Sequence, residues 1–186
     1  MKVLIIPENP RLDQYVLKPI VTAIFKDLER VARVDVLQDP RLQSVNQALD
    51  PKTLAGVIAS NPQRDLLLLL LDRDCEEFRI ERIKAREQEA LSMNRLLIGS
   101  LAFEEVEMWA LAVYDGPLPH SWQEMRRECH PKELFFEPLV TQLELENTVG
   151  RGRKRLMSSF TAKEHSRLLQ LCPEVAELQA RIKQVL

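Results

Sequence analysis

The stretch DLLLLLLDRDC, residues 65–75, contains six consecutive leucines that end at Asp72-Arg73-Asp74. Periodicity alone allows either a buried helix or a buried strand here. The run is short and charged residues follow it at once, which favours a central β-strand covered on both faces. Such a strand is typical of a parallel sheet with helices on each side.

The segments around this stretch alternate between strand and helix patterns. Apolar or alternating runs predict strands over 3–6, 31–37 and 95–101, and apolar residues at helical spacing predict helices over 12–30, 44–59, 76–91 and 104–113. Asp50-Pro51 can split the second of these helices in two. Strands that alternate with helical crossovers imply an α/β domain over residues 1–115, with a mostly parallel, four-stranded, Rossmann-like sheet.

The pattern changes after Gly116-Pro117-Leu118-Pro119, a turn-rich joint beyond which no strand pattern occurs. Helices are predicted over 121–128, 132–145, 162–171 and 174–185, with Thr161 and Pro173 as start signals for the last two. Residues 150–155, GRGRKR, are predicted to form a basic loop between helices. We therefore expect residues 116–186 to form a helical extension packed on the first domain.

Composition excludes several classes of protein. The chain has 186 residues and a formal net charge of -2, from 26 Lys+Arg and 28 Asp+Glu, so any phosphate-binding surface must be local. The longest apolar run, Leu66–Leu71, is far shorter than the roughly 20 residues that cross a membrane, and we expect no membrane association. Three widely spaced cysteines, Cys75, Cys129 and Cys172, predict no disulfide framework and a cytoplasmic location.

Three carboxylates follow strands of the predicted sheet. Glu8 comes after the first strand, and Asp72 and Asp74 come after the leucine strand. Sites in open parallel sheets form beyond the carboxyl ends of the strands, and carboxylates gathered there repel one another unless a divalent cation neutralises them. The pattern predicts that these residues hold Mg²⁺ or Mn²⁺. The alternative is that the acids cap helices or lie solvated in loops.

Several metal-binding α/β classes do not fit. A P-loop NTPase needs a glycine-rich loop ending in Gly-Lys-Ser or Gly-Lys-Thr, which the chain lacks. A dehalogenase-type phosphatase would place an Asp where this chain has Glu8, and a response-regulator receiver would need a Lys after the strand that ends at Leu101.

The chain resembles the Toprim (topoisomerase–primase) fold family, through Glu8 in VLIIPENP and the Asp72-x-Asp74 pair. It is most similar to small stand-alone Toprim proteins that are related to OLD-type nucleases and lie beside ATPases in bacterial defence loci. The further motifs of that resemblance are Glu105-Val106-Glu107-Met108-Trp109, Pro131-Lys132-Glu133-Leu134, the basic stretch 150–155 and Cys172-Pro173.

For nuclease members of the family, the resemblance implies Glu8 as an acid/base or metal ligand and Asp72 and Asp74 as Mg²⁺ ligands. Glu105 or Glu107 would complete a second metal position, and Glu107, which lies beside the Trp of the motif, is preferred. The expected function is a Mg²⁺- or Mn²⁺-dependent nuclease that cuts DNA or RNA phosphodiesters, as a defence effector with an ATPase partner.

The basic loop adds a candidate nucleic-acid surface. Arg151, Arg153, Lys154 and Arg155 are spaced so that they could grip phosphates, and Lys154 is the predicted transition-state cation. The loop could equally be a solvated, mobile segment.

Two other functions stay open. Where Toprim sequences usually have glycine after the first Glu and after the Asp-x-Asp pair, this chain has Asn9 and Cys75. A catalytically inactive Toprim subunit with a binding or regulatory role is therefore the alternative. A topoisomerase-like role would require a tyrosine-bearing breakage domain, for which the sequence gives no sign.

Overall fold

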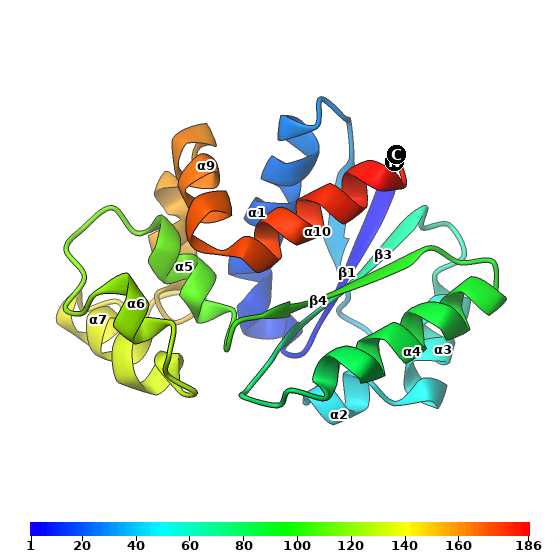
Figure 1. Cartoon of the computed structure of the whole chain (residues 1–186), viewed down its shortest axis with the longest axis horizontal. Coiled ribbons are helices and arrows are strands. Elements are labelled where there is room, and N and C mark those ends of the chain that lie inside the picture. Colours follow the sequence, from blue (N-terminus) through cyan, green and yellow to red (C-terminus); the bar gives the residue numbers. More distant parts are fainter.

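Four parallel strands form the centre of the computed structural model, which describes all 186 residues (Figure 1). They are β1 (Lys2–Pro7), β2 (Arg33–Val36), β3 (Leu66–Asp72) and β4 (Leu97–Ala102), in the spatial order β2-β1-β3-β4. The leucine strand β3 pairs with β1 on one side and β4 on the other, so it is central, as predicted. Its six leucines are at most 3% exposed.

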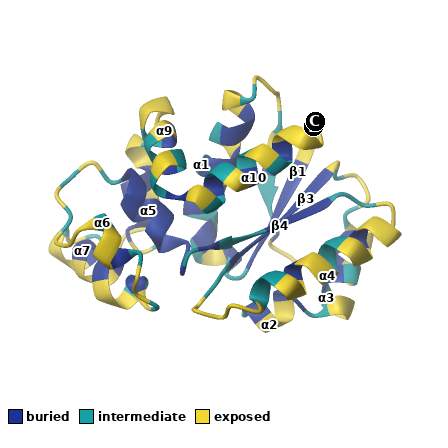
Figure 2. Ribbon diagram, viewed as in Figure 1, coloured by how far each residue is buried: buried dark blue, intermediate teal, exposed yellow.

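Each face of the sheet has its own hydrophobic core. Leu66, Leu68 and Leu70 pack into a cluster with α1 (Pro10–Asp27), whereas the alternate leucines of β3 pack into a second cluster on the opposite face. The second cluster is covered by α2 (Val45–Ala48), α3 (Pro51–Ser60) and α4 (Arg79–Ser92) (Figures 1 and 2). The strand is apolar at every position because successive side chains point to opposite faces that are both buried.

Helix starts follow the local sequence signals in most places. The predicted break at Asp50-Pro51 is confirmed, because the Asp50 carboxylate accepts the Thr53 backbone N–H at 2.8 Å and Pro51 begins α3. In contrast, α5 (Glu107–Val113) begins three residues later than predicted. The Glu104 carboxylate is turned away from this helix and accepts hydrogen bonds from Arg73 and from the Cys75 backbone N–H.

The residues after 115 form short helices, and the last of them, α10, returns to the sheet beside β4. The elements are α6 (Trp122–Met125), the π-helix η1 (Lys132–Phe136), α7 (Glu137–Gln142), α8 (Arg153–Leu156), the 3₁₀ helix η2 (Met157–Ser159), α9 (Ala162–Leu171) and α10 (Pro173–Gln184). Part of the predicted basic loop is therefore helical, since α8 begins at Arg153 after the left-handed Gly152. Val175, Leu178 and Ile182 of α10 belong to the same core as α1, on the same face of the sheet.

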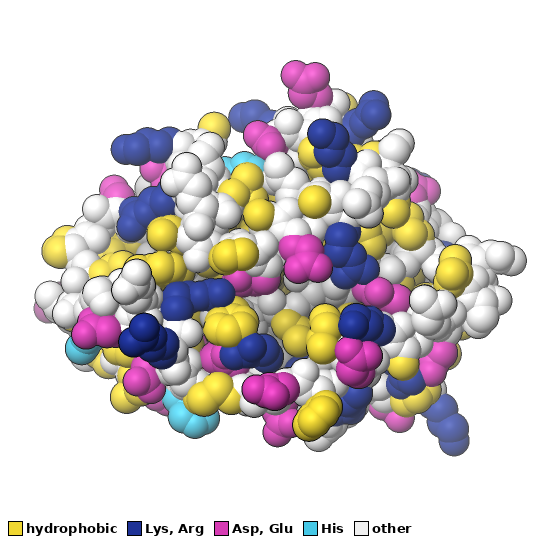
Figure 3. All heavy atoms as spheres, viewed as in Figure 1, with side chains coloured by type: hydrophobic (Ala, Val, Ile, Leu, Met, Phe, Trp, Pro, Cys, Tyr) yellow, Lys and Arg dark blue, Asp and Glu magenta, His cyan; other side chains and the backbone are white.

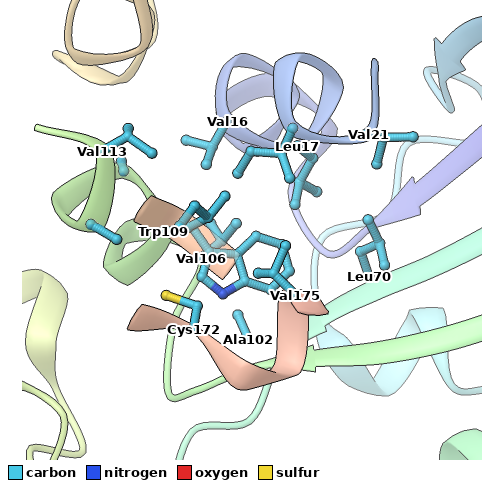
Figure 4. Close-up of a cluster of buried hydrophobic side chains, with 14 of the residues drawn as sticks. Val16, Leu17, Val21, Leu70, Ala102, Val106, Trp109, Val113, Cys172 and Val175 are labelled. Carbon is cyan, nitrogen blue, oxygen red and sulfur yellow. The ribbon is translucent and has the colours of Figure 1, made fainter. Parts of the chain in front are cut away.

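The two tryptophans join elements of the core and of the extension. Trp109 is 1% exposed and lies among Leu17, Leu70 and Val175 (Figure 4). Its indole N–H donates to the Glu174 carboxylate at 3.0 Å. The indole N–H of Trp122 donates to the Leu171 carbonyl at 3.1 Å, which joins α6 to the last turn of α9 within the extension.

The cysteines differ from the expectation. Cys75 and Cys129 form a disulfide, with their Cα atoms 5.5 Å apart, so the prediction of no disulfide was wrong. The pair joins the β3–α4 connection to the segment before η1, across 54 residues of sequence, a spacing that no local pattern reveals. Cys172 is buried and free. None of the helices is long and apolar enough to span a membrane.

Candidate functional site

Five acidic residues gather where β1 and β3 end. Glu8 follows β1, Asp72 closes β3 with Asp74 two residues beyond, Asp13 lies in the first turn of α1, and Glu107 begins α5. Burial raises the pKa of Asp72 well above its ordinary value, and the carboxylates of Glu107, Asp13, Glu8 and Asp74 raise it further. The carboxylates of these five residues, here called the acidic cluster, therefore repel one another electrostatically. The acidic cluster includes four of the predicted metal ligands.

Strand register accounts for this arrangement. Pro7 of β1 lies opposite Leu70 of β3, so Glu8 leaves the sheet beside the last residues of β3. Asp72 is fixed from the other side, because its carboxylate accepts the Val106 backbone N–H at 2.8 Å just before α5. Asp74 has a left-handed backbone, with φ of 47°, which begins the turn toward α4.

The charges in the cluster are poorly compensated. Burial raises the pKa of Glu8, with a further upward contribution from Asp74, and one carboxylate oxygen of Glu8, Oε2, is buried without a hydrogen-bond partner. Burial, followed by the Glu107 carboxylate, raises the pKa of Asp13 to about 7. A bound cation would reduce the repulsion between these carboxylates and would give the unpartnered oxygen of Glu8 a partner.

Glu105 and Glu107 face different surroundings. The Glu105 carboxylate accepts the Lys132 backbone N–H at 2.7 Å, and burial raises its pKa to about 7. Glu105 is not among the groups that act most strongly on Asp72, whereas Glu107 contributes more there than any other carboxylate. Of the two predicted ligands, Glu107 is therefore the one that faces the cluster.

Two basic side chains, Arg79 and Lys132, border the acidic cluster, and neither was predicted there as a counter-charge. Arg79 at the start of α4 pairs with Asp74 at 2.6 Å and donates to the Asp72 carbonyl. Lys132 begins the π-helix η1, a kind of element that is frequent at functional sites. Burial lowers the pKa of Lys132, but the carboxylates of Glu107 and Glu105 raise it, and the net shift is upward.

Asp13 was also not predicted as a residue of the site. Two features of the sequence could have indicated Asp13 and Lys132: Asp13 follows Glu8 by five residues, and Lys132 lies in the Pro-Lys-Glu-Leu motif.

No group of three or more His, Cys, Asp or Glu side chains is placed so that they would together hold a metal ion. Asp74 is paired with Arg79, and Glu107 is paired with Arg153. The donors themselves fit a hard divalent cation, because they are carboxylate oxygens and include the unpartnered oxygen of Glu8. To become a ligand, Asp74 would have to exchange Arg79 for the cation.

The predicted basic loop does not act as a unit. Arg153 is 3% exposed and pairs with Glu107, so it is not available for a phosphate, and this part of the prediction is corrected. Its burial follows from the need of Glu107 for a counter-charge in the interior. Lys154 lines a groove of about 890 Å³ beside α1 and is not among the groups that shift the pKa values of the acidic cluster. Lys132, and not Lys154, is therefore the lysine at the cluster.

The remaining basic residues of interest lie at the surface. Arg155 is exposed, and Arg151 lines a separate cavity with Arg11 and Arg41. Arg73 pairs with Glu104 and lies 3.4 Å from the centroid of the Phe103 ring, so its guanidinium is engaged outside the acidic cluster. On the face shown in Figure 3, basic and acidic side chains are interspersed, in keeping with the near-zero net charge.

The chain matches no family model, no curated protein and no solved structure. The resemblance to Toprim proteins thus stays a prediction that depends on the motifs.

Proposed function

We propose that the chain is a Mg²⁺- or Mn²⁺-dependent nuclease of the Toprim type, which hydrolyses phosphodiester bonds at the acidic cluster. One observation carries the proposal: four carboxylates, from β1, α1, the β3–α4 connection and α5, all raise the pKa of Asp72. Burying so many carboxylates together raises their pKa values, so protons neutralise part of the charge, and a divalent cation that displaces these protons would compensate the charges instead. Hard oxygen donors select Mg²⁺ or Mn²⁺.

The residues divide into roles by position. Glu8, Asp72 and Asp74 would hold the cation, which when bound supplies Lewis-acid activation of the phosphodiester and of a water molecule. Glu8 has a raised pKa and an unpartnered oxygen, which suit it to accept a proton from attacking water. Lys132 lies next to Glu105 and Glu107 and supplies positive charge where negative charge develops on the phosphate.

A second candidate is a catalytically quiet subunit that docks on an ATPase. The observation that favours it is that Arg79 and Arg153 already occupy Asp74 and Glu107. At these two acids, an arginine side chain already supplies the positive charge that a bound cation would supply. The same pairs also suit a nuclease in a resting state that a partner activates.

A cleavage assay tests the first proposal. The purified protein is incubated with plasmid DNA, and separately with RNA, in Mg²⁺ or Mn²⁺, beside an Asp72→Asn/Asp74→Asn variant. A second variant, Asp39→Asn/Asp115→Asn, removes two exposed carboxylates elsewhere and controls for net charge. We expect cutting by the wild type and the control and none by the first variant. Cutting that survives the loss of Asp72 and Asp74 contradicts the assignment of the site.

An Arg79→Gln variant separates a resting nuclease from a quiet subunit. If Arg79 competes with the cation for Asp74, its removal strengthens Mn²⁺ binding and raises the cutting rate. If neither the wild type nor Arg79→Gln cuts DNA or RNA in either metal, the quiet-subunit function is favoured. An Arg82→Gln variant, one turn further along α4, is the matched control.

A further inference from the structure

A cavity of about 560 Å³ beside the first turn of α1 is lined by three arginines and by no acidic residue. The arginines are Arg11 from α1, Arg41 from the β2–α2 connection and Arg151 from the segment before α8. None of them forms an ion pair within the chain. Three guanidinium groups around one cavity repel one another unless an anion lies between them.

This arrangement differs from that of many other arginines. Arg73, Arg126 and Arg181 each pair with a glutamate of a neighbouring element and so hold the fold together. Arg11, Arg41 and Arg151 come from three distant parts of the sequence and have no such partner. The planar fork of an arginine matches the oxygens of a phosphate, so three of them around one cavity suit a phosphate ligand.

The backbone adds to the positive character of the cavity. Asn9 and Arg11 at the start of α1 both line it, and α1 has 18 residues, so its positive dipole end lies there. Leu12 and Asp13 donate their N–H groups to the Asn9 carbonyl, but the Arg11 N–H has no backbone partner. On the opposite wall, Gly150 has φ of 75° and lies so close to the Tyr15 ring that a Cβ atom would clash with it.

The lining of the cavity is connected to the acidic cluster at two points. Asn9, which lines the cavity, directly follows Glu8, and its N–H donates to Asp13 at 2.8 Å. Arg151, which also lines the cavity, precedes by two residues the Arg153 that pairs with Glu107. The cavity therefore adjoins the acidic cluster along the chain on both sides.

We infer that Arg11, Arg41 and Arg151 bind a backbone phosphate of the nucleic-acid strand whose scissile bond lies at the acidic cluster. The inference rests on the proposed nuclease function for the identity of the strand. The cavity positions the strand, because one phosphate held by three arginines fixes which neighbouring phosphodiester meets Glu8 and Asp72. It replaces the predicted basic loop as the phosphate-binding surface, with Arg151 as the only residue common to both.

Binding without cutting tests the inference. The probe is a short single-stranded DNA, or an RNA of the same sequence, labelled at one end and titrated in EDTA with fluorescence anisotropy as the readout. The test variant is Arg11→Gln/Arg41→Gln/Arg151→Gln. The control, Arg30→Gln/Arg127→Gln/Lys183→Gln, removes three exposed positive charges elsewhere.

We expect the test variant to bind the probe at least about tenfold more weakly at low salt. Without the phosphate contact, binding releases fewer counterions from the nucleic acid. The slope of log affinity against log salt should become shallower by about 0.7, which is the loss expected when one phosphate of a single strand is no longer neutralised. The control should stay within about twofold of the wild type. Equal weakening of both variants means general charge attraction and overturns the inference.

Two further variants separate this inference from the proposed function. Arg11→Lys/Arg41→Lys/Arg151→Lys keeps the charge but loses the fork, and we expect it to recover the salt slope and only part of the affinity. Asp72→Asn/Asp74→Asn should bind the probe and fail to cut. If the wild type cuts and the glutamine variant binds as the wild type does, the phosphate-binding role of the cavity is wrong and the proposed nuclease function stands. If nothing cuts but the glutamine variant loses binding, the proposed nuclease function is wrong and the phosphate-binding role of the cavity stands.

Discussion

Glu107 and Arg153 form an ion pair in the interior of the molecule, where each side chain is 4% exposed. The pair links the first turn of α5 to the first residue of α8, and so ties the edge of the acidic cluster to the C-terminal extension. Arg153 also lies over the Phe136 ring, 4.9 Å from its centroid. A residue that was predicted to grip phosphates is thus part of the core.

Replacing Arg153 with methionine should therefore be strongly destabilising. The change leaves the Glu107 carboxylate buried without a partner, which costs about 3–5 kcal/mol. Urea unfolding measures the loss, and Arg151→Met, two residues away and exposed, should change stability by only about 0.5 kcal/mol. Adding Glu107→Gln to Arg153→Met should recover part of the loss. Equal stability of the two methionine variants would show that the pair is not buried in solution.

Asp13 should make stability depend on pH in the absence of metal. Burial and the Glu107 carboxylate raise the pKa of Asp13 from 3.8 to about 7, so the folded chain keeps a proton that the unfolded chain releases. The stability that this proton contributes is complete below about pH 4 and is lost as the pH rises through about 7.

An Asp13→Asn variant should remove this dependence. The amide can still accept the Asn9 N–H, but it carries no charge. The free energy of unfolding of the variant, relative to that of the wild type, should therefore increase by about 2 kcal/mol between about pH 5 and about pH 8. Urea unfolding in EDTA at the two pH values is the measurement. A constant difference between the two proteins would mean that Asp13 titrates normally.

The Cys75–Cys129 disulfide should contribute measurably to stability. It closes a loop of 54 residues, and a cross-link of that length is worth about 4 kcal/mol in the chain-entropy account. The unfolded, unreduced protein should show one free thiol, that of Cys172. Reductant should lower the melting temperature of the wild type and of Cys172→Ala, and it should leave Cys75→Ser/Cys129→Ser unchanged. Three free thiols in the unreduced protein would contradict the bridge.

Lys132 should matter for rate more than for metal binding. If it stabilises negative charge on the reacting phosphate, Lys132→Gln should lower the cutting rate by about 10²–10³-fold. Mn²⁺ affinity should not fall, because the change removes a positive charge from beside the acids. The exposed Lys163→Gln variant on α9 is the control. A parallel loss of Mn²⁺ affinity would assign Lys132 a structural role instead.

Much of the fold could be predicted from local pattern. The leucine run and the spacing of strands and helices were sufficient for the parallel four-stranded sheet, because the central strands of such a sheet are apolar on both faces and helices must cover it. The late start of α5 was not predicted, and Glu104 just before it bonds to Arg73, 31 residues away, a contact that local pattern does not show. The disulfide joins residues 54 apart in the sequence.

The candidate site was predictable where it follows strand ends. Glu8, Asp72 and Asp74 lie together because parallel strands end at one edge of a sheet, which their positions in the sequence already indicate. The counter-charges could not be assigned in this way. The sequence placed Arg153 in the basic stretch and Lys132 in the Pro-Lys-Glu-Leu motif. Only the packing of η1 and α8 against α5 shows that both residues meet the acids.

The central claim is that the acidic cluster binds a divalent cation, and titration calorimetry with Mn²⁺ tests it most directly. The wild type and Asp39→Asn/Asp115→Asn should bind Mn²⁺ with the same affinity, and Asp72→Asn/Asp74→Asn should show no binding. Equal Mn²⁺ binding by all three proteins, or by none of them, would contradict the account.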